Sequence, residues 1–228
     1  MAAKSPKPKK LVYKTLFVIA LLLILLMAVA YIYSLFQSSS GSFTVRTLGT
    51  VQGQLSLSET EGFSNPQSVL SGPSLDKMDN ISYSWIDLES IGQKDGAANG
   101  ENYLVYTYYV RNNSEAELSY RMSLVYDTAT KGVDSAVRIA VFKNGECTIY
   151  ALQAENGQPE SYPEGVVSFL NSGTVASEDQ SLAAGGIDKY TVLIWLEGED
   201  PECVDAVRGG YMQLEMRFSE LGSGAEAE

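Results

Sequence analysis

Hydrophobic and polar residues alternate with a period of two along much of the chain after residue 42. The clearest case is GYMQLEMRF, residues 210–218, in which one face carries Met212, Leu214, Met216 and Phe218. Residues 118–127, LSYRMSLVYD, repeat the alternation. Side chains of a strand point alternately to opposite faces of a sheet, so this spacing predicts strands with one buried face.

Further strands are predicted from composition and turn residues. Residues 102–110 are rich in aromatic and β-branched residues, and the short connection RNNSEAE to residues 118–127 predicts a hairpin. A second hairpin is predicted over residues 136–152, where Asn144-Gly145 supplies the positive φ of a tight turn. Residues 190–196, YTVLIWL, are apolar on both faces, which predicts a central strand. Weaker strands are predicted at residues 43–48, 51–57 and 81–88.

About nine strands and no long helix in this part of the chain predict an all-β domain over residues 43–220. Its expected architecture is a two-layer antiparallel β-sandwich or jelly roll. The connections at residues 59–80 and 153–188 are long. Since long structureless loops are uncommon, each is expected to hold short strands or a functional segment. Residues 37–42 are predicted to be a linker and residues 221–228 an acidic tail.

A different pattern precedes this domain. Leu16–Phe36 are 21 residues without charge or proline, and as a helix they would span about 31 Å, close to the thickness of a bilayer core. Five lysines and no acid occur in the first 36 residues, all five before this run. The sequence therefore predicts a signal anchor in the plasma membrane, with a transmembrane helix over residues 15–36, a cytoplasmic tail over residues 1–14 and the C-terminal domain outside the cell.

A cleaved signal peptide is the alternative. MAVA, which ends at Ala30, has the small-x-small pattern of a cleavage site. Against cleavage, the apolar run continues beyond Ala30, and Tyr31 and Tyr33 suit a membrane interface. The uncleaved anchor is favoured, and a secreted matrix or fibre subunit released after Ala30 remains the alternative.

Composition excludes several function classes. The chain has no histidine, so neither a Ser-His-Asp nor a Cys-His nucleophile can form within it, and histidine-ligated metals are excluded. Residues 37–228 hold the other 11 basic residues and all 28 acidic ones, a net charge of −17 that disfavours nucleic acid. A glycoside hydrolase with paired carboxylates is a further alternative, but no spacing singles out a pair. We predict a protein that is not an enzyme, without catalytic residues.

The segment WLEGEDPECVD, residues 195–205, gathers five acidic residues and has two interpretations. Asp200-Pro201-Glu202 is the order of a helix start, with an N-cap acid and proline at the first position, and residues 202–208 would form one or two turns. The alternative is calcium, the one cofactor considered, because carboxylates are hard oxygen donors suited to it. Its candidate ligands are Glu197, Glu199, Asp200, Glu202 and Asp205.

Two cysteines, Cys147 and Cys203, are predicted to lie on the oxidising side of the membrane, where a disulfide persists. A bridge between them would close a loop of 57 residues and stabilise the fold by about 4 kcal/mol in the chain-entropy model. Two separate thiols are the alternative.

Tyrosine is frequent, with fourteen in the chain, and two neighbouring predicted strands hold Tyr103, Tyr106, Tyr108, Tyr109, Tyr120 and Tyr126. Tyrosines on an outer face would form a binding surface. Packing within the sheets is the favoured interpretation.

Residues 103–124, 141–151 and 188–218 together resemble extracytoplasmic proteins of Gram-positive Firmicutes, in particular β-sandwich proteins of the TasA/camelysin type. The resemblance covers about the last 130 residues. It implies a β-sandwich outside the cell and self-assembly into surface or biofilm fibres, although some members have no assigned role. The lysine-rich tail and the poorly defined cleavage site depart from that pattern, and no site residues carry over. The expected function is a membrane-anchored cell-surface protein with a structural or binding role towards a protein or cell-wall partner.

Overall fold

The computed structural model describes residues 9–37, 42–74 and 78–221. Two compact units are present, residues 1–40 and residues 41–228. Three predicted segments lie largely outside the described residues: the start of the basic tail at residues 1–8, the linker at 37–42 and the acidic tail at 221–228.

Helix α1 (Lys9–Gln37) is continuous over 29 residues and includes the last three lysines of the predicted tail. Its side chains are described from Tyr13 to Val29, and all of these are exposed. Within the part of the chain that the structure describes, no helix has the length and apolarity needed to cross a membrane.

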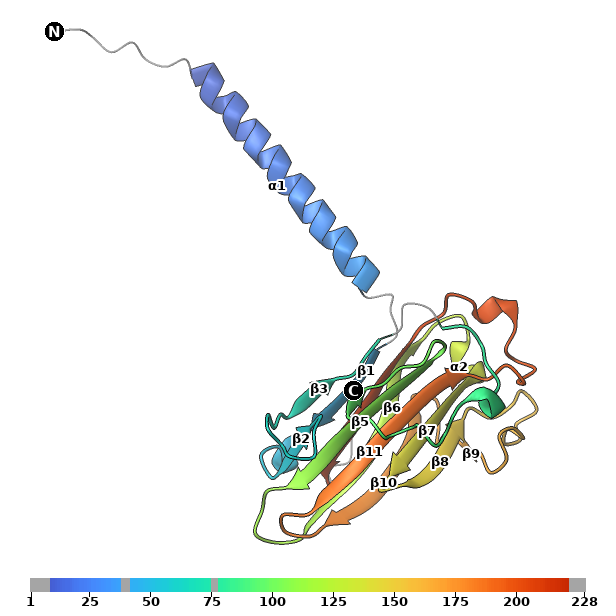
Figure 1. Ribbon diagram of the computed structural model, residues 1–228. Helices are drawn as coiled ribbons and strands as arrows, with labels where there is room; N and C mark the ends of the chain where they lie inside the picture. Colours follow the sequence, from blue (N-terminus) through green and yellow to red (C-terminus); the bar gives the residue numbers. More distant parts are fainter. Residues whose placement is uncertain (1–8, 38–41, 75–77, 222–228) are drawn as a thin grey trace, which may run out of the picture. The chain divides into compact units, whose positions relative to one another are not determined.

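The second unit is built from two β-sheets, as Figure 1 shows. The five-stranded sheet has the order β10 (Thr174–Leu182), β6 (Leu118–Ala129), β12 (Met212–Glu220), β1 (Ser42–Thr47), β3 (Val69–Ser71). The seven-stranded sheet has the order β2 (Leu55–Ser58), β5 (Tyr103–Asn112), β11 (Ile187–Leu196), β7 (Val137–Lys143), β8 (Glu146–Ala151), β9 (Val167–Ser168), with β4 (Gly96–Ala97) also paired to β5. Short helical turns are α2 (Val133–Ala136), η1 (Gly49–Val51), η2 (Tyr83–Trp85) and η3 (Asp205–Val207).

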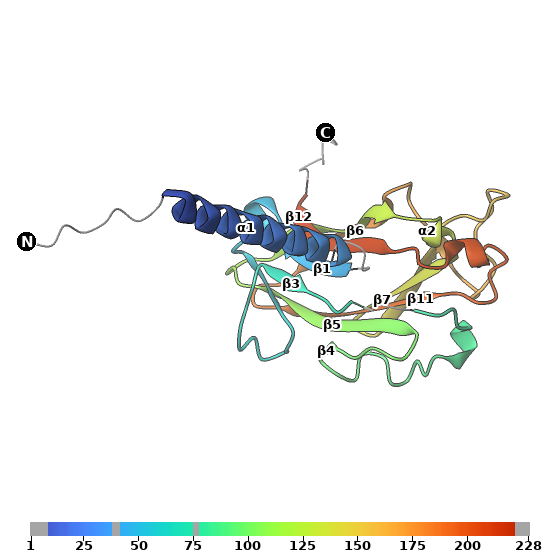
Figure 2. The ribbon, with the colours of Figure 1, turned by 90° about the horizontal axis from the view of Figure 1, so that it is seen from above.

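Figure 2 shows the layers from above, with β1, β6 and β12 in one and β5, β7 and β11 in the other. The prediction of an all-β, two-sheet domain is confirmed. The sheets are not wholly antiparallel, because β1 runs parallel to β12 and β9 parallel to β8. The hairpin predicted at Asn144-Gly145 is also confirmed: both residues have positive φ, 52° and 94°, and they join β7 to β8.

Aromatic side chains fill the space between the sheets. The ring of Phe218 on β12 lies 5.6 Å from that of Tyr190, 5.7 Å from that of Tyr120 and 6.5 Å from that of Tyr108, measured between centroids. Of the six tyrosines singled out in the sequence, all but Tyr103 are buried. Packing, and not a surface of tyrosines, is therefore the confirmed interpretation for those five.

A second core covers the outer face of the seven-stranded sheet. It contains Leu193 and Trp195 of β11 together with Ile86 from the connection that follows β3. The alternate residues of β11, among them Tyr190 and Val192, belong to the core between the sheets. Because β11 lies between two cores, both of its faces are apolar, which confirms the predicted central strand.

The predicted hairpin of residues 102–110 and 118–127 is wrong. The two segments form β5 and β6, which lie in different sheets. The connection crosses the end of the sandwich around Asn112, whose buried side-chain amide donates to the carbonyls of Ala116, Leu182 and Ala183 at 2.8, 2.9 and 3.1 Å. The chain leaves the sheet there because these contacts bind the end of β5 to the end of β10.

Two weak strand predictions also need correction. Residues 81–88 hold the 3₁₀ turn η2, because Trp85 and Ile86 donate back to the carbonyls of Ser82 and Tyr83 and do not join a sheet. In residues 51–57 the strand begins only at Leu55, after η1. The long connections do contain strands, as expected: β3 lies in the first and β9 and β10 in the second.

Candidate functional site

The turn after β11 contains the acidic residues that the sequence offers as candidate calcium ligands. Glu197, its first acid, is fully buried. Its carboxylate accepts hydrogen bonds from the indole Nε1 of Trp195 at 2.9 Å, from the backbone N–H of Tyr83 at 3.1 Å and from that of Glu199 at 3.0 Å. Glu197 therefore joins the strand, the η2 turn and its own loop, and it serves the fold.

Asp200 is the second buried acid and pairs with Arg138 of β7. The Arg138 Nη2 atom lies 2.8 Å from Asp200 Oδ2, and the two side chains are 1% and 0% exposed. Arg138 also donates to the backbone carbonyls of Tyr162 at 3.2 Å and Ser135 at 3.4 Å. One guanidinium thus connects three segments that are distant in the sequence, and its charge is compensated by the carboxylate.

Two more carboxylates complete the cluster. Glu160 Oε2 lies 3.3 Å from Arg138 Nη2, and the oxygens of Glu160, Asp200 and Glu202 all lie within 4.8 Å of one another. Burial raises the pKa of Glu160, and the charge of Asp200 raises it further, while Arg138 opposes both effects. Glu202 accepts the backbone N–H of Glu155 at 2.7 Å. The cluster carries three acids around one base.

The structure brings only two of the five predicted calcium ligands, Asp200 and Glu202, into this cluster. Glu197 binds structural donors, Glu199 is exposed, and Asp205 lies on the surface 3.4 Å from Arg208. Sequence reasoning missed Glu160 and Arg138, which come from a long loop and from a predicted hairpin. The signal that could have found Arg138 is a charged residue in the apolar run VRIAV, a position that needs an acidic partner.

The helix predicted at residues 202–208 is shorter than expected, a single 3₁₀ turn, although its capping contact is present. Asp200 Oδ1 accepts the backbone N–H of Glu202 at 2.7 Å, as an N-cap acid would. The chain then forms a turn and only the short 3₁₀ segment η3. The buried pair with Arg138 holds Asp200 at the base of the loop.

Calcium is expected to leave the thermal unfolding midpoint of the full chain unchanged. A calcium ion takes about six to eight oxygen ligands, and here the Arg138 guanidinium already lies beside Asp200 and Glu160, where it would repel a cation. The measurement is thermal unfolding with EDTA and with millimolar calcium. A midpoint that rises with calcium, and no longer does so in Glu202→Gln, would contradict this expectation.

The predicted disulfide is not formed, because Cys147 and Cys203 are both free. Cys147 lies in β8, four residues from Ala151, which pairs with Arg138 beside the turn. Cys203 lies in the turn after β11, where its backbone N–H donates to the carbonyl of Asp200 at 3.0 Å, so the two thiols belong to different elements. Burial raises the pKa of both thiols, and Asp200 raises that of Cys203 further, so neither is activated as a thiolate.

Comparison with known proteins leaves the family open. No family model matches the chain, and no curated protein matches it. Among solved structures it is similar to a β-glucosidase from Kluyveromyces marxianus, with 14% identity and a TM-score of 0.23. The similarity covers 71% of this chain and 16% of the β-glucosidase. At that TM-score the likeness supports no argument about function.

Proposed function

We propose that this protein is a single-pass envelope protein, anchored by its N-terminal helix, whose β-sandwich has a structural or binding role outside the cell. The proposal of a non-catalytic role rests on the contacts that the buried acids make within the fold. Glu197 accepts three structural hydrogen bonds, and Asp200 is paired with Arg138. These carboxylates hold segments of the fold together.

The geometry of the acidic cluster supports the same proposal. A glycoside hydrolase places two carboxyl groups on either side of the bond that it cleaves, about 5–9.5 Å apart. Here Asp200 and Glu160 both contact the Arg138 guanidinium, and Glu202 lies beside them, with one oxygen of each acid within 4.8 Å of the others. This arrangement is typical of a charge cluster that closes a loop.

Support for the anchor comes from the sequence and not from the structure, in which no described helix has the length and apolarity needed to cross a membrane. Fourteen consecutive apolar residues, 16–29, have exposed side chains all round the helix, and such a helix is stable only in apolar surroundings. The uncharged run continues to Phe36, beyond the side chains that the structure describes. The lysines before the run favour a cytoplasmic N-terminus. The resemblance to extracytoplasmic sandwich proteins agrees with this orientation.

Thiol labelling of intact cells tests the proposed topology. Cys147 is exposed, so a membrane-impermeant maleimide should label it in intact cells expressing the full chain. Cys147→Ser measures the background from Cys203. In a chain with both cysteines replaced, Ala3→Cys should be labelled only after permeabilisation. Labelling of Cys147 that requires permeabilisation would refute the proposal.

The intact mass of the purified protein separates the anchor from the secreted alternative. The full-length mass is expected. A chain lacking its first 30 residues would identify a secreted subunit, and the anchor would then be wrong while the sandwich would still lie outside the cell.

A further inference from the structure

Arg111 differs from the other arginines of the chain. There are six, all within the described residues. Five have a carboxylate partner: Arg46 and Arg217 with Glu215, Arg121 with Asp179, Arg138 with Asp200, and Arg208 with Asp205. Arg111 has none among the residues that the structure describes, although acids far outnumber bases in this unit. An arginine without an acid in so acidic a domain is available to an external anion.

Arg111 is held in place by neutral groups. It lies near the end of β5, opposite Ser56 of β2. Its guanidinium carbon is 4.3 Å from the centroid of the Phe63 ring, and its Nε donates to Asn113 Oδ1 at 3.1 Å. Stacking and one hydrogen bond orient the planar group without neutralising it. Its two terminal nitrogens have no acceptor among the described residues.

Asn113 adds a second donor beside the arginine. Its side-chain oxygen accepts from Arg111 Nε and also from Ser56 Oγ at 3.2 Å. Because both neighbours donate to the oxygen, the orientation of the amide is determined, and its NH₂ group is left to donate elsewhere. Arg111 and Asn113 together therefore present donors and need an acceptor.

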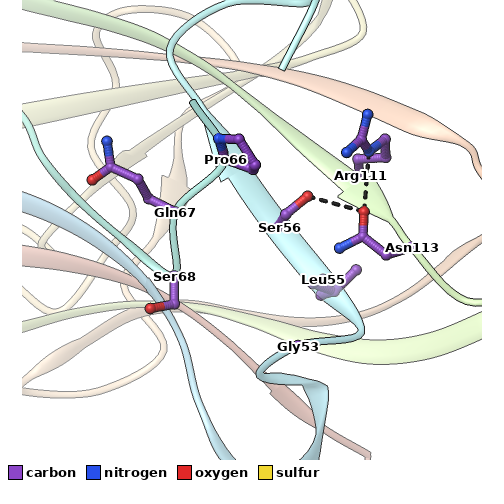
Figure 3. A pocket seen from close by; sticks show the side chains of 8 residues that line it. All are labelled: Gly53, Leu55, Ser56, Pro66, Gln67, Ser68, Arg111 and Asn113. Carbon is purple, nitrogen blue, oxygen red and sulfur yellow. Dashed lines mark hydrogen bonds between the residues drawn. The ribbon is translucent and has the colours of Figure 1, made fainter. Parts of the chain in front are cut away.

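These donors line a shallow pocket of about 380 Å³ that is largely open to solvent. Figure 3 shows Arg111, Asn113 and Ser56 together on β2 and the end of β5, with Pro66 and Gln67 on the segment that faces them. Leu55 borders the pocket but is itself buried, so the apolar surface comes from the exposed Pro66. The pocket thus combines one cationic wall with neutral and apolar walls.

We propose that this pocket binds a carboxylate carried by a small, otherwise uncharged molecule. The guanidinium fork matches the two oxygens of a carboxylate, and one arginine balances a single negative charge. A doubly charged phosphate would keep an uncompensated charge in a domain that is itself strongly negative. The proposal specifies a ligand for the binding role above, and it does not depend on the membrane anchor.

Ligand-observed NMR titration of the full chain in detergent tests the proposal. The probes are N-acetyl-L-alanine, a peptide-type carboxylate, and D-glucuronate, a sugar carboxylate, each compared with its neutral counterpart, N-acetyl-L-alaninamide or D-glucose. Saturable binding of at least one acid, and at least tenfold weaker binding of its neutral counterpart, is expected. Which acid binds identifies the source of the carboxylate.

Variants tie the binding to this pocket. Arg111→Gln should weaken the affinity at least tenfold. Asn113→Asp, which places a negative charge on the same wall, should abolish binding. Arg121→Gln removes the same charge from an exposed pair on the other sheet and should bind as the native protein does. No saturable binding of either acid, or undiminished binding by folded Arg111→Gln and Asn113→Asp, would overturn the proposal.

Discussion

Arg138→Met should lower the free energy of unfolding by about 3–5 kcal/mol, the usual cost of removing one partner of a buried ion pair. The methionine replaces the aliphatic stem of the arginine and removes only its guanidinium head. Asp200, 0% exposed, would keep its charge without the guanidinium 2.8 Å away, and Glu160 would lose its cation as well. The carbonyls of Tyr162 and Ser135 would also lose a donor. Chemical denaturation of the full chain in detergent measures the change.

The control is Arg121→Met, which breaks an ion pair of similar length at the surface. Arg121 Nε lies 2.7 Å from Asp179 Oδ1, but the two side chains are 36% and 58% exposed, and an exposed pair contributes about 1 kcal/mol or less. If Arg138→Met costs no more than this control, the cluster does not hold the turn in place. Adding Asp200→Asn to Arg138→Met should recover part of the loss, because the uncompensated charge is then removed.

Asn112→Ala is the second substitution with a large expected effect, a loss of about 2–4 kcal/mol in the free energy of unfolding. Each buried polar group left without a partner costs about 1–3 kcal/mol. The fully buried amide of Asn112 donates to three carbonyls, and its oxygen accepts the backbone N–H of Ser114 at 2.9 Å. Alanine removes all of these contacts where β5 crosses to the other sheet. Chemical denaturation again provides the measurement.

Asn113→Ala is the matched control, since the same residue type is removed one position later, where the side chain is exposed. Water can replace its contacts, so a loss below about 1 kcal/mol is expected. Equal losses for the two variants would show that the contacts of Asn112 with Leu182 and Ala183 do not stabilise the crossing between the sheets.

Several elements could be predicted because their information is local. Alternation in residues 118–127 and 210–218 identified β6 and β12, since a half-buried strand repeats its burial every second residue. Asn144-Gly145 identified the β7–β8 turn through the positive φ that these residues tolerate. The apolar run of β11 indicated burial on both faces. In the acidic turn, the contact of Asp200 with the backbone of Glu202 was also local and was correctly anticipated.

Other features depend on contacts between distant parts of the chain. β10, TVASEDQSL, has a polar sequence because it is an edge strand, so hydrophobic spacing did not identify it. Arg138 and Glu160 join Asp200 from segments about 60 and 40 residues away in the sequence, and no spacing predicts such a meeting. Arg111 could be recognised as unpaired only once the partners of the other five arginines were known.

By itself, the sequence determined the class of the domain, most strand positions and the exclusion of histidine chemistry, because burial periodicity, turn conformation and side-chain chemistry are properties of neighbouring residues. Only the tertiary structure decided which sheet each strand joins, which acids surround Arg138 and which arginine faces a pocket. Those outcomes depend on how the chain crosses between layers at residues such as Asn112, where long-range hydrogen bonds outweigh the local preference for a hairpin.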